Sequence, residues 1–207
     1  GEQPATRGRE AGRAAGYPTH VPAVTIERKC GSSQQAVEFA AAGIVAGLYD
    51  IVIAGGVESM SRVPLGSPRM DKDPFGAGVR ARFPGLVPQG VSAELVAQRW
   101  SLSREQLDAY SARSHARAAA TASSGGFDRE IVPIRVPGPD GEQVVTQDET
   151  IRPQTTVEGL AALEPAFATP DMRERFPGLE WKITAGNSSQ ITDGASALLV
   201  MSEERAE

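Results

Sequence analysis

The sequence predicts an α/β fold, because two apolar, β-rich runs flank a segment with helical spacing near the N-terminus. Residues 32–49 carry apolar side chains three and four positions apart, which is typical of a helix with one buried face. Residues 21–26 precede this segment, and the continuous apolar run 50–54 that follows it suits a strand covered on both faces. A strand, a helix and a strand within about thirty residues predict a βαβ unit, the repeating element of α/β sheets.

Two of the predicted helices begin with a capping box, in which a Ser and a Gln side chain each accept a hydrogen bond from a free backbone N–H group. Ser32 and Gln35 match this pattern at the start of the first helix. Ser103 and Gln106 match it at the start of a second helix, which is predicted to run to residue 123.

Turn residues and spacing predict the remaining elements. Residues 61–90 are punctuated by Pro and Gly, and they predict a loop too long for an ordinary connector, which indicates a functional site or an inserted domain. Helices are predicted at 1–16, 92–100 and 156–163, and strands at 130–136, 143–145, 181–185 and 195–201, with a turn at 137–141. The chain is therefore expected to enter the sheet early, leave it for an insertion, and return to it at the end.

The composition excludes several classes of function. The 207 residues include 21 Lys and Arg and 26 Asp and Glu, and the net charge of −5 gives no general affinity for nucleic acid or anionic membranes. The single cysteine, Cys30, excludes an internal disulfide and a multi-thiolate metal site, and His20 and His115 are too few for a zinc site. No apolar run approaches the roughly 20 residues of a membrane span.

The N-terminus has no signal-peptide character, so a cytoplasmic protein is expected. The first residue is Gly1 rather than Met, which suggests that the chain starts inside a longer one.

Cys30 is the strongest candidate for a catalytic residue. It lies between the predicted strand 21–26 and the helix that is predicted to begin at Ser32. Unpaired N–H groups and the dipole at a helix N-terminus favour a negative charge on its sulfur, which suits a nucleophile. Position alone leaves an alternative, in which Cys30 is a buried structural cysteine.

The sequence around this cysteine, Val24-Thr-Ile-Glu-Arg-Lys-Cys30-Gly-Ser-Ser-Gln-Gln-Ala36, resembles the nucleophile signature of the thiolase family. The next segment, Asp50-Ile-Val-Ile-Ala-Gly-Gly-Val-Glu-Ser-Met-Ser61, resembles the strand, Gly-Gly turn and Glu-Ser-Met-Ser phrase that follow in the family. Further phrases resemble the family in the same order along nearly the whole chain: Gly90-Val-Ser-Ala-Glu94, Ser103-Arg-Glu-Gln-Leu-Asp108, Gly126-Phe-Asp-Arg-Glu-Ile-Val-Pro133, Asp148-Glu-Thr-Ile-Arg152 and Thr184-Ala-Gly-Asn-Ser-Ser-Gln-Ile-Thr-Asp-Gly-Ala195.

The resemblance implies the N-terminal half of the thiolase fold, a layered α-β-α domain with an inserted, mainly helical loop domain. Residues 1–61 then form the first part of the α/β core, 62–180 the inserted loop domain, and 181–207 the return to the core, with the C-terminal thiolase domain absent. In the family, two such halves pack in an α-β-α-β-α stack. The chains of the family also pair as dimers, so a homo-oligomer, a dimer or a tetramer, is expected of the complete protein.

The resemblance also implies the chemistry of a CoA-dependent acyltransferase, as in acetyl-CoA acetyltransferases and the 3-ketoacyl-CoA thiolases of fatty acid β-oxidation. Cys30 takes an acyl group from a 3-ketoacyl-CoA or from acetyl-CoA and passes it to free CoA or to an enolate. Coenzyme A and acyl-CoA are substrates, and no permanently bound cofactor, nucleic acid or membrane partner is expected. The backbone N–H of Cys30 is expected to be one donor of an oxyanion hole.

Two further residues match family positions that contact coenzyme A. Ser189 matches a position at the pantetheine arm, and Arg152 matches an arginine near the CoA nucleotide. The alternatives are local turn hydrogen bonds for Ser188 and Ser189, and a solvated surface side chain for Arg152.

Two departures from the family pattern lie close to the expected site. Ser33 stands where the family usually has Gly, which removes conformational freedom and adds bulk near the nucleophile. Pro88-Gln89-Gly90 replaces the His-Met-Gly of the biosynthetic subgroup, which favours a degradative 3-ketoacyl-CoA substrate over acetoacetyl-CoA synthesis.

The largest departure is that the His and second Cys phrases of the family's C-terminal half do not occur, and neither His20 nor His115 matches them. The family's first strands are also missing, so apolar sheet surface is expected to remain uncovered. The chain alone is therefore expected to be inactive. Two alternatives stay open: a truncated, catalytically inactive module that binds acyl-CoA or a partner chain, and a related ketoacyl synthase, against which the Glu-Ser-Met-Ser and Ala-Gly-Asn-Ser-Ser phrases argue.

Overall fold

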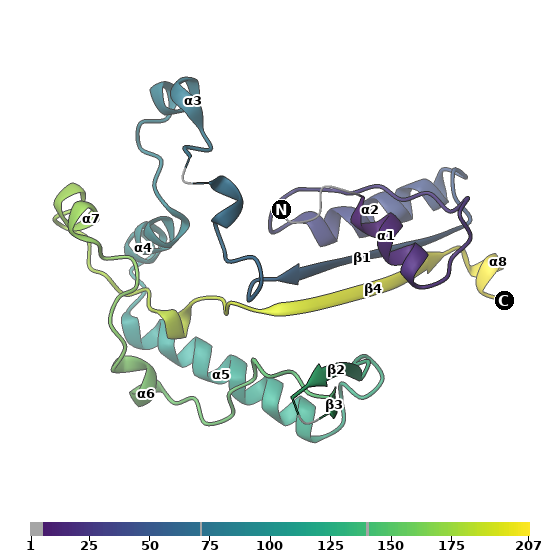
Figure 1. The fold of residues 1–207 in the computed structure, drawn as a ribbon. Helices are drawn as coiled ribbons and strands as arrows, with labels where there is room; N and C mark the ends of the chain where they lie inside the picture. The colour runs from purple at the N-terminus through teal and green to yellow at the C-terminus, as the bar shows by residue number, and fades with distance from the viewer. Residues whose placement is uncertain (1–5, 71, 140) are drawn as a thin grey trace. The chain divides into compact units, whose positions relative to one another are not determined.

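The computed structural model describes residues 6–70, 72–139 and 141–207, and the chain divides into two compact units (Figure 1). The first unit combines the chain up to Pro74 with Ile191–Glu207, and the second is Phe75–Gln190. Both units contain helices and a small sheet, which is consistent with the α/β class.

The first unit is built on a two-stranded antiparallel sheet. Strand β1 pairs with strand β4 along its whole length, from Ile51 opposite Met201 to Ser59 opposite Asp193. The helix α2 packs on this sheet, and Ala40 of the helix and Ala54 of the strand are buried. The elements of this unit are α1 (Arg7–Ala14), α2 (Ser32–Val45), β1 (Ile51–Ser59), the 3-10 helix η1 (Ser67–Arg69), β4 (Asp193–Met201) and α8 (Glu203–Ala206).

Strand β1 continues beyond the predicted range 50–54, through the two glycines at which a turn was expected. The reason lies in the opposite strand. A Cβ at Gly55 would lie only 2.6 Å from the carbonyl oxygen of Ser196, so the missing side chain lets the two backbones pair closely. The predicted Gly-Gly turn is therefore wrong, and the predicted strand 195–201 is confirmed within β4.

One face of the sheet carries apolar side chains that remain open to solvent. Side chains alternate between the two faces of a strand, so residues 51, 53 and 57 of β1 share a face, as do their register partners on β4. Ile51, Ile53, Val57 and Leu199 are all more than half exposed on it.

The predicted strand 21–26 is wrong, because these residues form no strand in the structure. A strand is defined by its pairing, and the observed sheet of this unit consists of β1 and β4 alone. The parallel βαβ unit expected from the sequence is therefore not formed by the described residues.

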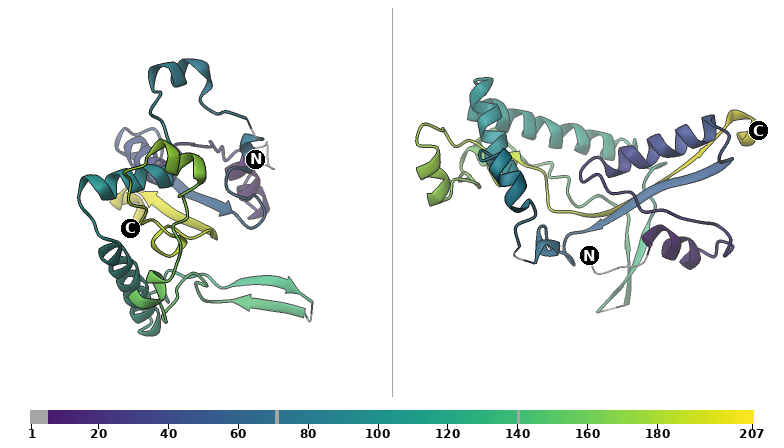
Figure 2. Two further views of the ribbon diagram at one scale, coloured as in Figure 1. Left: turned by 90° about the vertical axis from the view of Figure 1, so that its left-hand side faces the viewer. Right: turned by 90° about the horizontal axis from the view of Figure 1, so that it is seen from above.

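The second unit is mainly helical (Figure 2). Its core contains the buried side chains of Val91, Ala97, Leu160, Leu179 and Ile183. The elements are α3 (Gly76–Arg82), α4 (Gln89–Arg99), α5 (Arg104–Ser123), β2 (Ile134–Gly138), β3 (Gly141–Val145), α6 (Val157–Ala161), α7 (Pro170–Arg175) and the 3-10 helix η2 (Ala185–Asn187).

Local signals predicted helices in both units. Helix α5 has the expected capping box, in which Ser103 accepts from the backbone N–H of Gln106 and the side chain of Gln106 accepts from that of Ser103. Helices α1, α4 and α6 also occur within or close to their predicted ranges, although residues 1–5 of the first lie outside the described residues.

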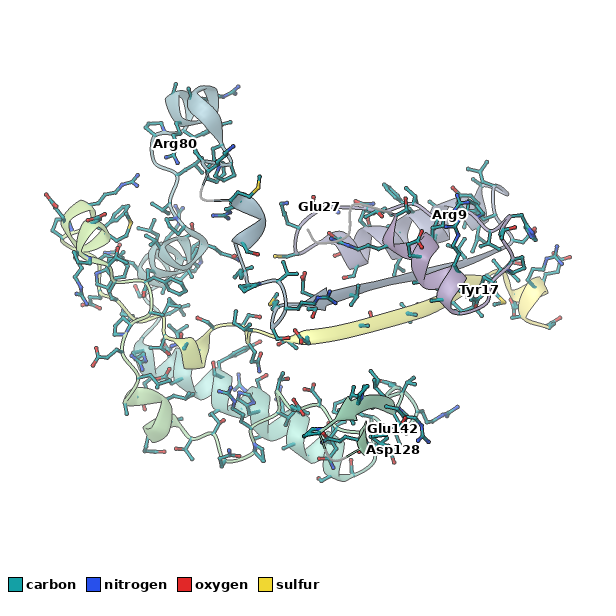
Figure 3. The ribbon with its side chains drawn as sticks, in the orientation of Figure 1. Arg9, Tyr17, Glu27, Arg80, Asp128 and Glu142 are labelled. Atoms are coloured by element: carbon teal, nitrogen blue, oxygen red, sulfur yellow. The ribbon has the colours of Figure 1, made fainter. Side chains whose placement is uncertain are left out.

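The hairpin β2–β3 is antiparallel, with an ion pair of 2.7 Å between Arg135 Nη1 and Glu142 Oε1; Figure 3 labels Glu142. It confirms the two predicted strands, although β2 begins only at Ile134, and Asp140 of the predicted turn lies outside the described residues.

Two further predictions are wrong. The stretch 61–90 was expected to be a loop but holds η1 and α3, whose short turns of helix are set among its Pro and Gly residues. Residues 181–185 form no strand; only Thr184 pairs, in an isolated bridge with Pro165. The backbone N–H of Thr184 binds the side chain of Asn187 instead of continuing a ladder.

Candidate active site

Cys30 is exposed and lies directly before helix α2, whose N-cap residue is Gly31. A tight turn places it there. The N–H of Gly31 donates to the carbonyl of Arg28 at 3.0 Å, and Lys29 has a φ of 49°, in the left-handed region that non-glycine residues rarely adopt. The sequence expectation of a cysteine at a helix N-terminus is therefore met in position, and the alternative of a buried cysteine is not.

The hydroxyl of Ser32 holds this turn closed. It accepts a hydrogen bond from the N–H of Arg28 at 2.8 Å and donates one to the carbonyl of Lys29 at 2.6 Å. The predicted capping box of Ser32 and Gln35 is therefore wrong, because Ser32 is the first helical residue and its side chain turns back toward the segment before Cys30.

The N-terminus of α2 keeps free donors. The backbone N–H groups of Ser33 and Gln34 form no hydrogen bond with another described residue. The neighbouring cations are already paired: Arg28 Nη1 donates to the side chain of Gln35 at 2.9 Å, and Lys29 donates to Glu27, which Figure 3 labels. The hydrogen bond and charge of Lys29 lower the pKa of the Glu27 carboxyl. The free donors, rather than a side chain, are thus available to a negative charge beside Cys30.

Ser189 and Arg152 both lie in the second unit, whereas Cys30 belongs to the first. Ser189 is exposed, and its side chain forms no hydrogen bond with another described residue. The Arg152 side chain is exposed, while its backbone N–H donates to Nδ1 of His115 at 3.2 Å. The two segments meet, because Gln190 Nε2 donates to the carbonyl of Thr150 at 3.4 Å.

The segment before Ser189 is held by buried polar side chains that the sequence did not single out. Thr184 is fully buried and its hydroxyl accepts from the N–H groups of Gly186 and Asn187, at 3.2 and 3.3 Å. The side chain of Asn187 donates to Asp108 Oδ1 of helix α5 at 2.9 Å. Ser188 forms the local turn bond that the sequence left open, donating to the carbonyl of Thr184 at 2.6 Å.

Glu94 of helix α4 holds the other end of the same segment. Its carboxylate accepts from the backbone N–H groups of Lys182 and Ile183 at distances of 2.7 to 2.9 Å. The signal that could have found it is a carboxylate among the apolar positions of a helix, since such a group must have a partner once buried.

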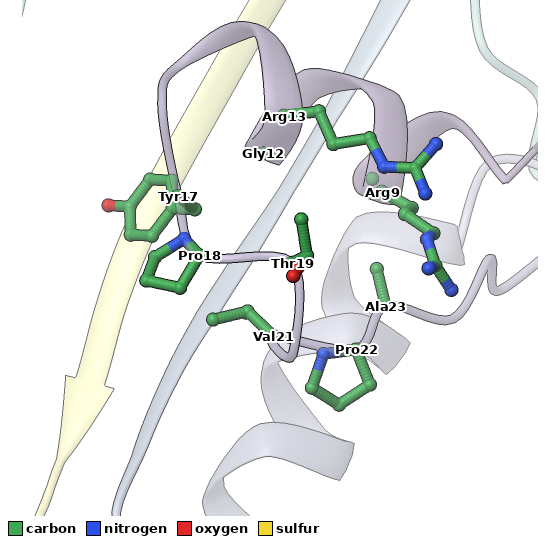
Figure 4. A pocket seen from close by; sticks show the side chains of 10 residues that line it. Arg9, Gly12, Arg13, Tyr17, Pro18, Thr19, Val21, Pro22 and Ala23 are labelled. Carbon is green, nitrogen blue, oxygen red and sulfur yellow. The ribbon is translucent and has the colours of Figure 1, made fainter.

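The hollows on the two units differ in size and chemistry. In the first unit, a cavity of about 30 Å³ lies beside α1, with Arg9, Arg13 and Tyr17 among its lining residues (Figure 4). It is large enough to hold water but not a larger ligand. In the second unit, an apolar depression of about 430 Å³ lies along α4, between Gln89, Val96, Leu102 and Ile183.

Across the described ranges, no group of three or more His, Cys, Asp or Glu side chains is arranged to hold a metal ion. Within those same ranges, no helix has the length and apolar character needed to cross a membrane.

Comparison with known families connects these features. The sequence matches the model of the thiolase N-terminal domain over residues 1–204. The chain belongs to the thiolase family. The site residues expected of a thiolase therefore lie within the matched range, Cys30 in the first unit and Arg152 and Ser189 in the second.

Similar thiolases come from enteric bacteria. A 3-ketoacyl-CoA thiolase of Escherichia coli O139:H28 is 45% identical over 201 residues, which cover 96% of this chain and 48% of that protein. The 3-ketoacyl-CoA thiolases of Shigella boydii serotype 4 and Escherichia fergusonii are 45% and 44% identical over the same shares. The chain thus spans about half the length of these curated relatives.

Proposed function

We propose that this chain supplies the nucleophile-bearing part of a thiolase that degrades 3-ketoacyl-CoA, with Cys30 as the nucleophile. The observation that carries the proposal is the place of Cys30, exposed in a tight turn before α2 and next to free helix N–H donors. The match to the family and the names of its relatives support the reaction class.

In the proposed reaction, the Cys30 sulfur bonds to the 3-keto carbon of the substrate. The bond between carbons 2 and 3 then breaks, and its electron pair goes to carbon 2, which takes up a proton and leaves as acetyl-CoA. The sulfur of free CoA, after losing its proton, attacks the new thioester and releases the Cys30 sulfur. The N–H of Cys30 would donate to the oxygen on which negative charge develops.

Coenzyme A would be bound by the second unit through Ser189 and Arg152. The exposed hydroxyl of Ser189 suits a hydrogen bond to the amides of the pantetheine arm, and the exposed guanidinium of Arg152 suits a phosphate of the nucleotide. The bond between Gln190 and Thr150, which joins their two segments, supports a common role. CoA and acyl-CoA are then substrates, and no permanently bound cofactor takes part.

We further propose that residues 62–180 form the inserted loop domain of the family fold and that the complete protein is a homo-oligomer. The compact second unit, Phe75–Gln190, supports the insertion, as does the pairing of β1 with β4 from either side of it. The exposed apolar side chains of the β1–β4 sheet support an association through further structure.

A second candidate function is a module that binds acyl-CoA or a partner chain without catalysis. The observation that favours it is that thiolysis needs a base, and neither His20 nor His115 lies in a family phrase that supplies one. His115 is also occupied through Nδ1 by the backbone N–H of Arg152.

The test compares the 207-residue chain with a fusion to the C-terminal half of the Escherichia coli relative. Thiolysis of acetoacetyl-CoA is followed by the loss of substrate absorbance. The fusion is expected to turn over, Cys30→Ala to abolish its activity and Cys30→Ser nearly to do so, while the chain alone is expected to be inactive. A folded fusion whose activity survives Cys30→Ala would contradict the role of Cys30. Turnover by the chain alone, with its mass confirmed, would contradict the missing base and make His115 the first candidate.

A further inference from the structure

The segment that ends at Ser189 rests on two carboxylates that the second unit buries completely. Glu94 and Asp108 have no exposed surface, and each accepts hydrogen bonds from a residue of this segment. A buried carboxylate without partners would cost several kcal/mol, so such groups occur where a geometry must be fixed. Glu94 binds the backbone where the segment begins, at Lys182 and Ile183, and Asp108 binds it near Ser189.

Asp108 is itself fixed by Arg104, one turn earlier on helix α5. Arg104 Nε donates to Asp108 Oδ2 at 2.7 Å, and Arg104 Nη2 donates to the carbonyls of Leu160 and Leu163. The other carboxylate oxygen, Oδ1, is left for the side chain of Asn187. Among the described residues, each oxygen of Asp108 therefore has one donor, the guanidinium of Arg104 or the amide of Asn187.

Asn187, which is bound to Asp108, also forms hydrogen bonds with the backbone of the segment. Its Oδ1 accepts from the N–H of Thr184 at 2.8 Å, and its Nδ2 also donates to the carbonyl of Lys182 at 3.0 Å. The hydroxyl of Ser188 is bound in turn to the carbonyl of Thr184. Ser189 is the next residue, and it is exposed with its side chain free. A free hydroxyl thus follows directly on a backbone segment that is held by hydrogen bonds at Lys182, Thr184, Gly186 and Asn187.

We infer that Asp108 is a positioning residue for coenzyme A, acting through Asn187 to fix the Ser189 hydroxyl for a hydrogen bond to the pantetheine arm. The inference rests on the proposed function, because Ser189 meets CoA only if that function holds. Its physical basis is preorganisation: a hydroxyl on a fixed backbone loses less conformational freedom on binding than one on a mobile loop.

The test is the substitution Asp108→Asn, which keeps the shape of the side chain but replaces one acceptor by a donor. That donor faces either Arg104 or Asn187, which are donors themselves, so one hydrogen bond must break. Isothermal titration of the chain with coenzyme A is expected to give an affinity about tenfold lower. Hydrogen exchange at the amides of Gly186 and Asn187, which donate to the Thr184 hydroxyl, is expected to be faster.

The matched control is Ser103→Ala, which removes the cap of the same helix without touching the segment 182–189. It destabilises α5 but is expected to leave CoA affinity and the exchange at Gly186 and Asn187 unchanged. A second variant, Asn187→Ala, removes the link while keeping the pair of Arg104 and Asp108. It is expected to weaken CoA binding as Asp108→Asn does, and it decides the matter if Asp108→Asn does not fold.

A double-mutant cycle separates positioning from general loss of structure. In a Ser189→Ala background, Asp108→Asn is expected to have almost no further effect on CoA affinity, because Asp108 acts through Ser189. An unchanged tenfold effect in that background would overturn the inference.

The remaining outcomes distinguish the inference from the function on which it rests. No binding of CoA by the wild-type chain overturns the proposed function, and the role of Asp108 with it. Wild-type binding that Asp108→Asn and Asn187→Ala both leave unchanged overturns the inference alone.

Discussion

Ser61 donates two hydrogen bonds to the carboxylate of Asp193, one from its backbone N–H at 2.9 Å and one from its hydroxyl. Asp193 is the first residue of β4, and Ser61 lies two residues beyond the last residue of β1, so the pair closes one end of the sheet. It also joins the phrase that ends at Ser61 to the phrase 184–195, two segments that are far apart in the sequence.

The first prediction concerns the acid sensitivity of this pair. The two bonds from Ser61 lower the pKa of the Asp193 carboxyl, because they favour its charged form. Since the folded pKa is the lower one, the pair stabilises the fold at pH values above the ordinary Asp pKa of about 4, and this contribution is lost as the pH falls through the folded pKa. Ser61→Ala is expected to raise the pKa of Asp193 in a carboxyl-detected NMR titration. Ser196→Ala on the same strand is the control and should leave it unchanged; an unchanged value in Ser61→Ala would refute the assignment.

The second prediction concerns the reactivity of Cys30. The free N–H groups of Ser33 and Gln34 should stabilise the negative charge that the sulfur carries when it attacks an electrophile. We expect the folded chain to react with iodoacetamide about two- to fivefold faster than a model thiol at neutral pH, the range that corresponds to a helix-end effect of about 0.3–1 kcal/mol. Labelling followed by mass spectrometry measures the rate, and urea-unfolded protein is the control. A folded rate no higher than that of the model thiol would remove the activation.

The third prediction concerns the packing at the start of α4. A Cβ at Gly90 would lie 2.2 Å from the ring of Phe167, so Gly90→Ala must displace that ring. We expect the free energy of unfolding to fall by about 1–3 kcal/mol. Urea unfolding followed by the fluorescence of Trp100 and Trp181, both in the second unit, measures it. Gly78→Ala in α3 is the matched control, because a Cβ there meets nothing within 4 Å, and it should leave the midpoint unchanged or raise it. Equal midpoints for the two variants would mean that the Phe167 ring is not packed on Gly90.

The fourth prediction concerns the apolar face of the β1–β4 sheet. Ile53 and its register partner Leu199 are 51% and 62% exposed on this face, and burial of such surface is favourable. The chain is therefore expected to self-associate at micromolar concentrations in sedimentation velocity experiments, and Ile53→Lys or Leu199→Lys is expected to shift it toward the monomer. Val45→Lys on α2, where the side chain is 89% exposed, is the control and should not. A wild-type chain that stays monomeric throughout would show that this face does not drive association.

Elements with strong local signals could be predicted from the sequence. The pair of Ser103 and Gln106 predicted the start of α5, because the hydrogen bonds of a capping box form within four consecutive residues. The apolar runs that became β1 and β4 were also visible, since a strand that is largely apolar stands out from its neighbours.

Elements that depend on a distant partner were predicted less well. Residues 21–26 have the composition of a strand but form none, because a strand exists only where another backbone pairs with it. Ser32 has the type and spacing of a cap, yet its hydroxyl finds nearer partners in the turn formed by Arg28 and Lys29. The Ser32 side chain could either cap the helix or bond the preceding turn, and in the structure it bonds the turn before Cys30.

The sequence by itself determined the family, through phrases in a fixed order, and it determined which residue is the candidate nucleophile, because Cys30 is the only thiol in the chain. Only the tertiary structure decided that Asp108 and Glu94 are buried beneath the segment leading to Ser189. Their partners, Asn187 and Ile183, lie 79 and 89 residues away along the chain. A carboxylate on a helix is ordinary until it is buried, and burial is what forces it to take a partner, which no local pattern can name.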